Sequence, residues 1–594
     1  MLALILTLCS WGMIPGEPNQ EADLAQARAL FDRNIAAIQE RDREAYLSCY
    51  LDSALLARGG PQGIDAGISG LAEGTPPSGS PRWPERLTAR DLQLQWLDEG
   101  LVYGTYRYHV DYGGDLAAGL SERLFKRTDQ GWRIVLTTAF NAAAGQAGAP
   151  LALVGARVHL GDGSAPINDA VIVTRDGLIE SIGPRESTPI PTDVDVLDVT
   201  GQTITPGLID AHVHYSQTGW ADGRPDAWDV SDRYPYPAVM SELEQQPERF
   251  HRAFLASGIT AVFDVGGYPW TRRLSKTSEL SFEAPHIAAA GPLLATWVPD
   301  VLRLPDQATL VLMEDEEQVR RSVRSHAAAG SDAIKVWFVV RGGKTVEQLA
   351  PLVLAAGDEA SKVGLPLVVH ATDLATARVA LEAGASLLVH SVDDALVDQE
   401  FVDRALQIDV SYCPTLTVVQ GYIDLFGRHL SDELSGQLAS GRVHPSIAKR
   451  VRTTPELPAA DALSDAAIAA MEQRRLAAEA IMASNLTRLA DAGVNIAAGT
   501  DAGNPLTLHG PSIYPELEAM QAAGMRPLDV LTAATFGAAK AMGRGHDLGL
   551  LQPGRIADLI ILDDDPATDI AALRSITQVM RAGHLQKASS LNPR

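Results

Sequence analysis

Residues 206–214 have the sequence PGLIDAHVH, in which a short apolar run leads into two histidines. Side chains repeat with period two along a strand, so both imidazoles project from one face. Other short apolar runs also end on polar residues, which are Lys335, His370, His390 and Asp501. Such runs are typical of buried parallel strands. Polar groups at the carboxyl ends of parallel strands are what a (β/α)8 barrel offers, because its active sites form at that face.

The strand candidates repeat often enough to build that barrel. Helix-like stretches separate most of them, and about eight such units predict an α/β fold with a (β/α)8 TIM barrel over residues 206–545. The segment from Gly421 to Ala470 is longer than a simple connection, so we expect a helical insertion or lid there. The expected strands are Gly207–Ala211, Ala261–Val265, His286–Ala290, Ala333–Trp337, Leu367–His370, Leu387–His390, Val410–Tyr412 and Ile496–Ala498.

Short strands separated by Gly, Asp and Pro flank the barrel on both sides. They predict a small composite β-sandwich domain from residues 151–205 and 546–586, because two distant segments can then share one core.

The first part of the chain predicts a separate α+β domain over residues 21–145. An apolar helix face around Leu30 precedes alternating stretches that end in a hairpin with a turn at Gly131. A Gly/Pro/Ser-rich stretch from Gly59 to Pro84 predicts a loop. Helices followed by a curved sheet resemble the NTF2-like or SnoaL-like cone. The Ala/Gly-rich residues 142–150 predict a linker.

Composition limits the partners of this protein. The chain has 594 residues and a net charge of −25, which argues against a surface that binds nucleic acid.

Residues 1–20 form an apolar leader that predicts export to the periplasm or the cell exterior; the alternative is a short apolar tail on a cytoplasmic protein. Nothing else approaches a membrane span, so we expect none in the mature chain. Three cysteines make no disulfide framework, and any metal must be held by nitrogen and oxygen.

Four motifs occur in order along the chain: Thr205–Ala211 before the histidine pair, Gly258–Val262, Gly499–Gly503 and Gly549–Ile560. Together they resemble the amidohydrolase superfamily, in its imidazolonepropionase-like and prolidase-like branch, from Leu153 to Gly583. Two departures stand beside the expected pocket. Phe263 replaces an arginine common in relatives, and Ser391 follows His390 where many relatives have glycine. The substrate therefore cannot be carried over from them.

The resemblance implies two divalent metal ions, with zinc as the expected ion for nitrogen and oxygen ligands. His212, His214, Lys335 and Asp501 would hold one ion, and Lys335, His370 and His390 the other. Lys335 would carry a CO₂-derived carbamate, which bridges two cations where an ammonium would be repelled; the alternative is a buried lysine in a salt bridge. A metal-bridging hydroxide would attack the substrate, with Asp501 as the proton shuttle.

The expected function is hydrolysis of a C–N (amide or peptide) bond in a small substrate such as a dipeptide or N-acyl amino acid. Hydrolysis of a cyclic amide, lactone or ester by the same site is the first alternative, and a non-catalytic binding protein is the second. His509 is expected to bind substrate, with loop packing as an equal alternative. Tyr236 is a second candidate for substrate binding, although loop packing around Pro235 and Pro237 is the simpler role for it. The oligomeric state is left open, with a homo-oligomer as one arrangement.

Overall fold

The structure is a computed structural model that describes residues 20–60, 63–84, 86–111, 116–141, 148–304, 307–460 and 462–594. Apart from Gln20, the expected leader lies outside the described residues. The chain divides into two compact units, Met1–Gln146 and Ala147–Arg594. None of the helices in the described ranges combines the length and apolar character that a membrane crossing requires.

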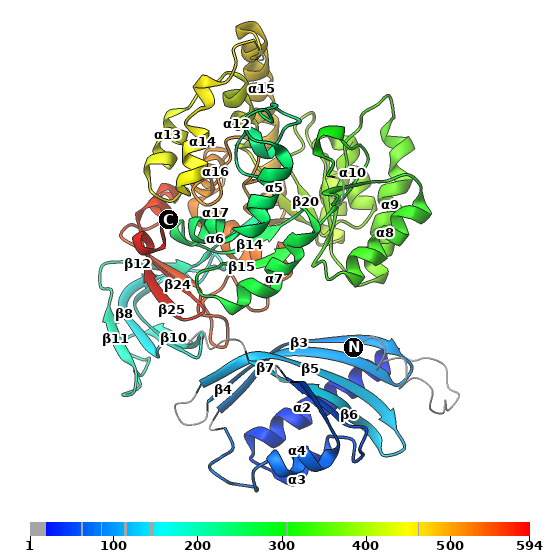
Figure 1. The fold of residues 1–594 in the computed structure, drawn as a ribbon. Helices are drawn as coiled ribbons and strands as arrows, with labels where there is room; N and C mark the ends of the chain where they lie inside the picture. Colours follow the sequence, from blue (N-terminus) through cyan, green and yellow to red (C-terminus); the bar gives the residue numbers. More distant parts are fainter. Residues whose placement is uncertain are drawn as a thin grey trace. The chain divides into compact units, whose positions relative to one another are not determined.

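The first unit is a largely antiparallel sheet that curves around helix α2 (Gln20–Gln39) (Figure 1). The strand order is β2-β1-β6-β5-β4-β3, with β7 beside β5. Leu30 and Phe31 of α2 pack with Phe125 and Ile134 of the sheet. The elements after α2 are α3 (Arg43–Ser48), β1 (Ala57–Gly60), β2 (Gly63–Ala66), α4 (Ile68–Gly74), β3 (Arg86–Asp98), β4 (Leu101–Asp111), β5 (Leu116–Thr128), β6 (Gly131–Thr138) and β7 (Phe140–Asn141). The alternating stretches are confirmed as strands, and the likeness to an NTF2-like cone stays a prediction.

The loop expected from Gly59 to Pro84 was wrong in part, because β1, β2 and α4 form within it. Glycine-rich residues have weak strand preference on their own. Strand β1 is nevertheless paired in parallel with β6, with Ala57 opposite Leu136 and Gly59 opposite Thr138. This long-range pairing, which no local pattern reports, supplies the hydrogen bonds that hold β1 extended.

A composite β domain joins both flanks of the second unit. Its sheet order is β10-β9-β8-β12-β23-β24-β25, and β11 pairs with β8. The central pairing is antiparallel between β12 and β23, from Thr203 opposite Leu562 to Pro206 opposite Leu559. The strands are β8 (Leu151–Val158), β9 (Ile167–Arg175), β10 (Leu178–Pro184), β11 (Asp195–Asp198), β12 (Thr203–Pro206), β23 (Leu559–Leu562), β24 (Ile576–Arg581) and β25 (His584–Lys587).

Eight parallel strands form a closed barrel in the rest of the second unit, as expected. They are β13 (Leu208–Val213), β14 (Ile259–Asp264), β15 (His286–Ala289), β18 (Ile334–Trp337), β19 (Leu367–His370), β20 (Leu387–Val389), β21 (Ser411–Cys413) and β22 (Asn495–Ile496). The Asp332 amide donates to Ala289 O at 2.9 Å and joins β15 to β18. The Ala211 amide donates to Ala498 O at 2.9 Å and closes the ring. Short strands β16 (Leu293–Ala295) and β17 (Leu310–Leu312) extend the sheet beside β18.

Helices cover the outside of the barrel, and three of them begin at aspartate caps. Asp315, Asp373 and Asp398 accept the amide hydrogen three residues later, at 2.8–2.9 Å. The surrounding helices are α5 (Tyr236–Gln245), α6 (Glu248–Ala256), α7 (Leu274–Thr277), α8 (Glu316–Ala328), α9 (Val346–Lys362), α10 (Leu374–Glu382), α11 (Gln399–Gln407), α16 (Ile513–Ala522), α17 (Pro527–Thr532) and α18 (Ala538–Ala541).

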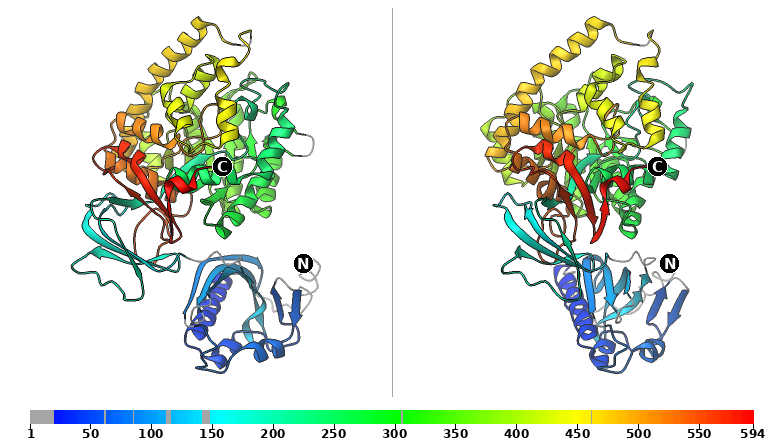
Figure 2. Two further views of the ribbon diagram at one scale, coloured as in Figure 1. Left: turned by 60° about the vertical axis from the view of Figure 1, so that its left-hand side comes forward. Right: turned by 90° about the vertical axis from the view of Figure 1, so that its left-hand side faces the viewer.

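The expected insertion between the last two barrel strands is helical. It contains α12 (Val418–Phe426), α13 (Asp432–Ala439) and α14 (Pro445–Val451), followed by the long α15 (Asp465–Asp491). Figure 2 shows α15 projecting from the barrel beside these shorter helices.

Candidate metal centre

The six candidate ligands come from five barrel strands but lie at the same end of the barrel. The four histidines stand at or within one residue of the carboxyl ends of their strands, whereas Lys335 lies inside β18 and Asp501 follows β22 by five residues. The parallel order of the strands explains why residues so distant in sequence meet. His390 and Asp501 have positive φ angles of 77° and 61°. A left-handed backbone is unusual for non-glycine residues, and such conformations concentrate at functional sites. The six residues are His212, His214, Lys335, His370, His390 and Asp501.

Asp501 is the centre of this cluster. Its Oδ1 lies 3.2 Å from His212 Nε2 and 3.0 Å from His214 Nε2. Side-chain ligand atoms of His212, His390 and Asp501 all lie within 4.8 Å of one another. The ring centres of His370 and His390 are 4.4 Å apart. Imidazole nitrogens and a carboxylate oxygen therefore converge on one small volume.

Outer contacts orient two of the histidines. His214 Nδ1 donates to the Gly266 carbonyl at 2.7 Å. His390 Nδ1 forms a 2.7 Å hydrogen bond with Thr415 Oγ1, in which Nδ1 is the donor when Nε2 is the metal-binding atom. A hydrogen bond at Nδ1 leaves the lone pair of Nε2 directed into the cluster, which is the arrangement that metal-binding histidines use.

Burial sets the charge states of the cluster. It lowers the pKa of His212 and His370 well below 6.5 and that of His390 to about 4, so these imidazoles are neutral. Burial also lowers the pKa of Lys335 to about 7. Burial raises the pKa of Asp501, but the adjacent His212 and His214 outweigh that effect and hold it well below its usual range.

These groups fit divalent metal ions. Neutral imidazoles and an ionised carboxylate are the forms in which these side chains bind metal. Within the described part of the chain, Asp501 Oδ1 is buried without a hydrogen bond, and so is His212 Nδ1. An acceptor atom buried without a partner is costly, and a cation coordinated by Asp501 Oδ1 would satisfy it.

Two acidic residues that sequence reasoning missed brace the site. Asp210 accepts hydrogen bonds from the Thr500 amide at 3.0 Å and from its hydroxyl at 2.6 Å, which ties β13 to the turn that carries Asp501. Glu516 of α16 accepts from the amides of Leu416 and Thr417 at 2.7 and 3.0 Å. A charged residue inside the apolar run PGLIDAHVH is unusual, so the sequence could have marked Asp210 as a functional candidate. No sequence pattern linked Glu516 to the loop that contains Leu416 and Thr417.

Arg224 reaches the turn that carries Asp501 through a single intervening side chain, that of Asn504. Its guanidinium binds Asp226 at 2.7 and 2.8 Å and also contacts the side-chain oxygen of Asn504. That oxygen accepts from Tyr422 at 2.8 Å as well, and the Asn504 amide nitrogen donates to Asp501 O at 3.2 Å. With 17% of its side chain exposed, Arg224 brings a partly accessible cation close to the cluster.

An aromatic pair lies beside His370. The half-buried Trp337 ring centre is 6.2 Å from that of His370 and 5.9 Å from that of Trp297. Trp337 shares a face of β18 with Lys335, since the two residues are separated by two positions.

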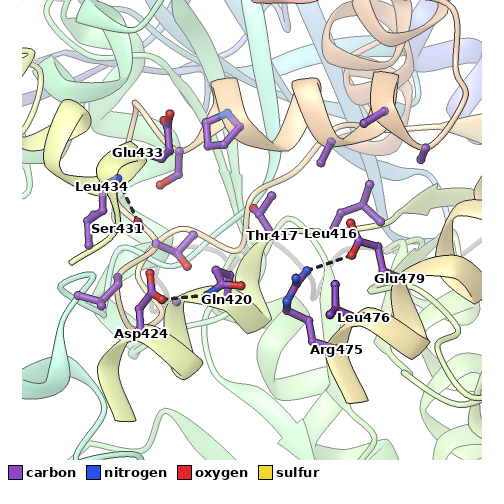
Figure 3. Close-up of a pocket in the computed structure, with 18 of the residues that line it drawn as sticks. Leu416, Thr417, Gln420, Asp424, Ser431, Glu433, Leu434, Arg475, Leu476 and Glu479 are labelled. Atoms are coloured by element: carbon purple, nitrogen blue, oxygen red, sulfur yellow. Dashed lines mark hydrogen bonds and ion pairs between the residues drawn. The ribbon is translucent and has the colours of Figure 1, made fainter. Parts of the chain in front are cut away.

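A separate cavity of about 590 Å³ lies among α12, α13, α15 and α16 (Figure 3). Leu416, Thr417 and Thr507 form part of its wall, and none of the six candidate ligands is among its lining residues. Ion pairs and hydrogen bonds already occupy most of its polar groups, as between Arg475 and Glu479 at 3.2 Å.

The structure does not bring His509 and Tyr236 into the ligand cluster. His509 is buried, stacks on Phe250 with ring centres 3.7 Å apart, and binds His214 O at 3.0 Å. Burial lowers the pKa of His509 to about 3. Tyr236 is buried and accepts a hydrogen bond from Tyr268 at 3.1 Å. These contacts favour packing over substrate binding for both side chains.

Comparisons with known proteins agree with this geometry. A model of the amidohydrolase family matches residues 203–585. The imidazolonepropionase of Geobacillus sp. (strain WCH70) is 24% identical over 429 residues, covering 67% of this chain and 84% of that protein. A solved structure of a putative prolidase from Bifidobacterium longum is 25% identical with a TM-score of 0.55, covering 74% of this chain and 95% of that one. A Xaa-Pro dipeptidase with bound methionine shares the fold at 22% identity and a TM-score of 0.53, covering 74% of this chain and 100% of that one.

Proposed function

Since the chain belongs to the amidohydrolase family, we propose that it is a two-metal hydrolase that cleaves the amide bond of a dipeptide or N-acyl amino acid. The observation that carries this proposal is the buried cluster in which the imidazoles of His212, His214 and His390 converge on the Asp501 carboxylate. His212, His214, Asp501 and Lys335 would hold one ion, and Lys335, His370 and His390 the other. Zinc is the ion we expect from this nitrogen and oxygen set.

Lys335 is suited to carry a carbamate. It is 2% exposed, and burial lowers its pKa to about 7, so a large fraction of the amine is unprotonated at neutral pH. An unprotonated amine adds to CO₂ through a new N–C bond and loses one proton to solvent, and the resulting carbamate is an anion whose two oxygens would suit two cations. A lysine kept as an ammonium at this position would instead repel divalent ions.

A pair of divalent ions would acidify a water molecule and polarise the substrate carbonyl. Asp501 lies where it can accept the proton that this water loses on attack, and it can then pass the proton to the departing nitrogen. Asp210 and Thr500 hold the turn that carries Asp501 in place. The amine is a poor leaving group, so this protonation is the step in which the chain's own residues matter most.

The surroundings of the cluster support a small substrate that bears a carboxylate. The partly exposed Arg224 places a positive charge near the cluster, which favours a carboxylate, although its Nε and Nη2 already bind Asp226 and its Nη1 contacts Asn504. Trp337 offers an apolar surface beside His370. An N-acyl amino acid carries a carboxylate on one side of the amide bond and its acyl group on the other, and a dipeptide has an amino group as well as a side chain on the acyl side.

The test combines metal analysis with a matched substrate panel of dipeptides, N-acyl amino acids, esters and lactones. We expect about two ions per chain and turnover of at least one amide class. If every matched ester or lactone is hydrolysed much faster than every amide tested, the protein should be assigned as an ester or lactone hydrolase. A protein with neither metal nor turnover would be a binding protein.

The location of the protein is a separate proposal. We infer export from the apolar leader, and fractionation of the native host tests it. Recovery of the unprocessed chain in the cytoplasm would contradict export without affecting the proposed chemistry.

A further inference from the structure

The cavity among α12, α13, α15 and α16 has the size and the wall of a small-molecule site. Its volume of about 590 Å³ falls within the range of ligand pockets, roughly 300–1,000 Å³. Such pockets combine a mainly apolar wall with a few polar groups. The larger apolar side chains of this wall are Leu416, Leu434, Leu476 and Leu506, and several alanines lie between them. The cavity can therefore enclose an apolar body.

Asp424 of α12 is the carboxylate of this wall that has spare capacity. Only 7% of the residue is exposed. Its Oδ1 accepts a hydrogen bond from Gln420 at 2.8 Å (Figure 3). The nearest cationic candidate is His429, whose Nδ1 lies 3.8 Å from the same oxygen and whose side chain is 66% exposed. The other oxygen, Oδ2, accepts no hydrogen bond from any residue that the structure describes.

The other charged side chains of the wall are already paired. Both oxygens of Glu433 accept from Arg574 at 3.1 Å. Glu479 pairs with Arg475 at 3.2 Å, as Figure 3 shows. Within the described residues, Asp424 is thus the one carboxylate of the wall that lacks an arginine or lysine partner. A buried charge without a partner is costly, so the cavity favours a cationic ligand.

Thr507 supplies a second unused oxygen. Its amide donates to Asn504 O at 2.9 Å, but its hydroxyl forms no hydrogen bond with a described residue, although only 4% of Thr507 is exposed. A Cβ added at Gly421 of α12 would overlap Pro505 O and lie 3.3 Å from Thr507 Oγ1, so this hydroxyl faces α12. Asp424 lies three positions after Gly421, which places both on one side of that helix.

We propose that this cavity binds a small primary amine with an apolar body, and that Asp424 and Thr507 receive its ammonium group. An ammonium group has three N–H donors and a positive charge. Asp424 Oδ2 and Thr507 Oγ1 would accept two of these donors, and the leucine side chains would enclose the body of the ligand. A neutral or anionic molecule of the same shape would leave Asp424 without a counter-charge. The site is separate from the metal centre and from the hydrolysis proposed there.

Titration calorimetry on the metal-loaded full chain tests this site, with benzylamine as the probe. We expect saturable binding that weakens at least tenfold in Asp424→Asn. The matched control is Glu433→Gln, which removes an equal charge from the same wall, but one that Arg574 already neutralises. Glu433→Gln should bind benzylamine as the wild type does. Benzyl alcohol has the same shape without the charge and should bind at least tenfold more weakly than benzylamine.

Thermal melts and metal content show whether each variant is folded. Thr507→Val keeps the shape of the side chain, and its loss of the hydroxyl should also weaken benzylamine. The proposal is overturned if benzylamine does not bind the wild type, or if Asp424→Asn binds it unchanged, as it would if the amine bound a metal ion instead. It is equally overturned if Glu433→Gln weakens binding as much as Asp424→Asn, because a general attraction to acidic groups would then suffice.

Discussion

Thr415 is the residue whose replacement tests the metal centre most sharply. Thr415→Val keeps the β-branched shape and removes the hydroxyl that accepts a 2.7 Å hydrogen bond from His390 Nδ1. The imidazole then loses the contact that orients Nε2, and a buried N–H is left without a partner. Outer-contact substitutions of this kind typically cost about 10–100-fold in metal affinity. This range corresponds to about 1.4–2.8 kcal/mol for one of the two ions.

The assay is competition with a chelator over a series of free zinc concentrations, with bound metal counted directly. Thr417→Val is the matched control, because its hydroxyl donates to Glu516 at 2.8 Å from the same loop without touching a candidate ligand. We expect Thr415→Val to weaken one of two ions and Thr417→Val to weaken neither. Equal metal affinity in wild type and Thr415→Val would refute the orienting role and count against His390 as a ligand.

Four further results are expected. Lys335→Ala should lose most metal and activity, with partial rescue by short carboxylic acids; full metal content in this variant would remove the carbamate from the scheme. Asp501→Asn should lower turnover by ~10²–10⁴-fold, and near-normal kcat would assign the proton transfer to another group. Burial raises the pKa of Glu516 from 4.5 to about 7, so the folded state binds this proton more tightly than the unfolded state does. Glu516 should then contribute a loss of roughly 3 kcal/mol of stability to the metal-free protein as pH rises from about 4.5 to about 7, and unfolding free energies of Glu516→Gln should fall less steeply over that range; parallel curves would contradict it. A chain beginning at Pro150 should keep its metals and activity, and a soluble, metal-loaded but inactive product would place part of the site in the first unit.

The barrel and the gathering of the candidate ligands at one end of it were predictable because their signals are local. Each strand is a short apolar run, and each polar residue that ends a run is carried to the same face by the parallel order of the strands. His390 is an example: the run Ser386–Val389 ends on it, and the structure places it beside His212 with ring centres 4.9 Å apart.

The surroundings of the cluster were not predictable, because they depend on contacts between distant segments. No sequence pattern distinguishes Thr415 from other loop residues, and its contact with His390 appears only in the folded structure. His509 looked well placed to bind substrate after the last strand, yet it stacks on Phe250 from a helix more than 250 positions earlier.

The pairing of β12 with β23 has a consequence for how the protein is made. After β12 has been synthesised, the ribosome must still add residues 207–558 before β23, the antiparallel partner of β12, begins to form. At about 5–20 residues per second, the edge of β12 stays open for roughly 20 to 70 seconds. During that interval, apolar residues such as Ile204 lack the β23 side of their core. Nascent chains should therefore depend on chaperones until translation is almost finished. Truncated chains that end before Leu559 lack β23, so cellular proteases should degrade them. Only chains that contain the last strands should then accumulate.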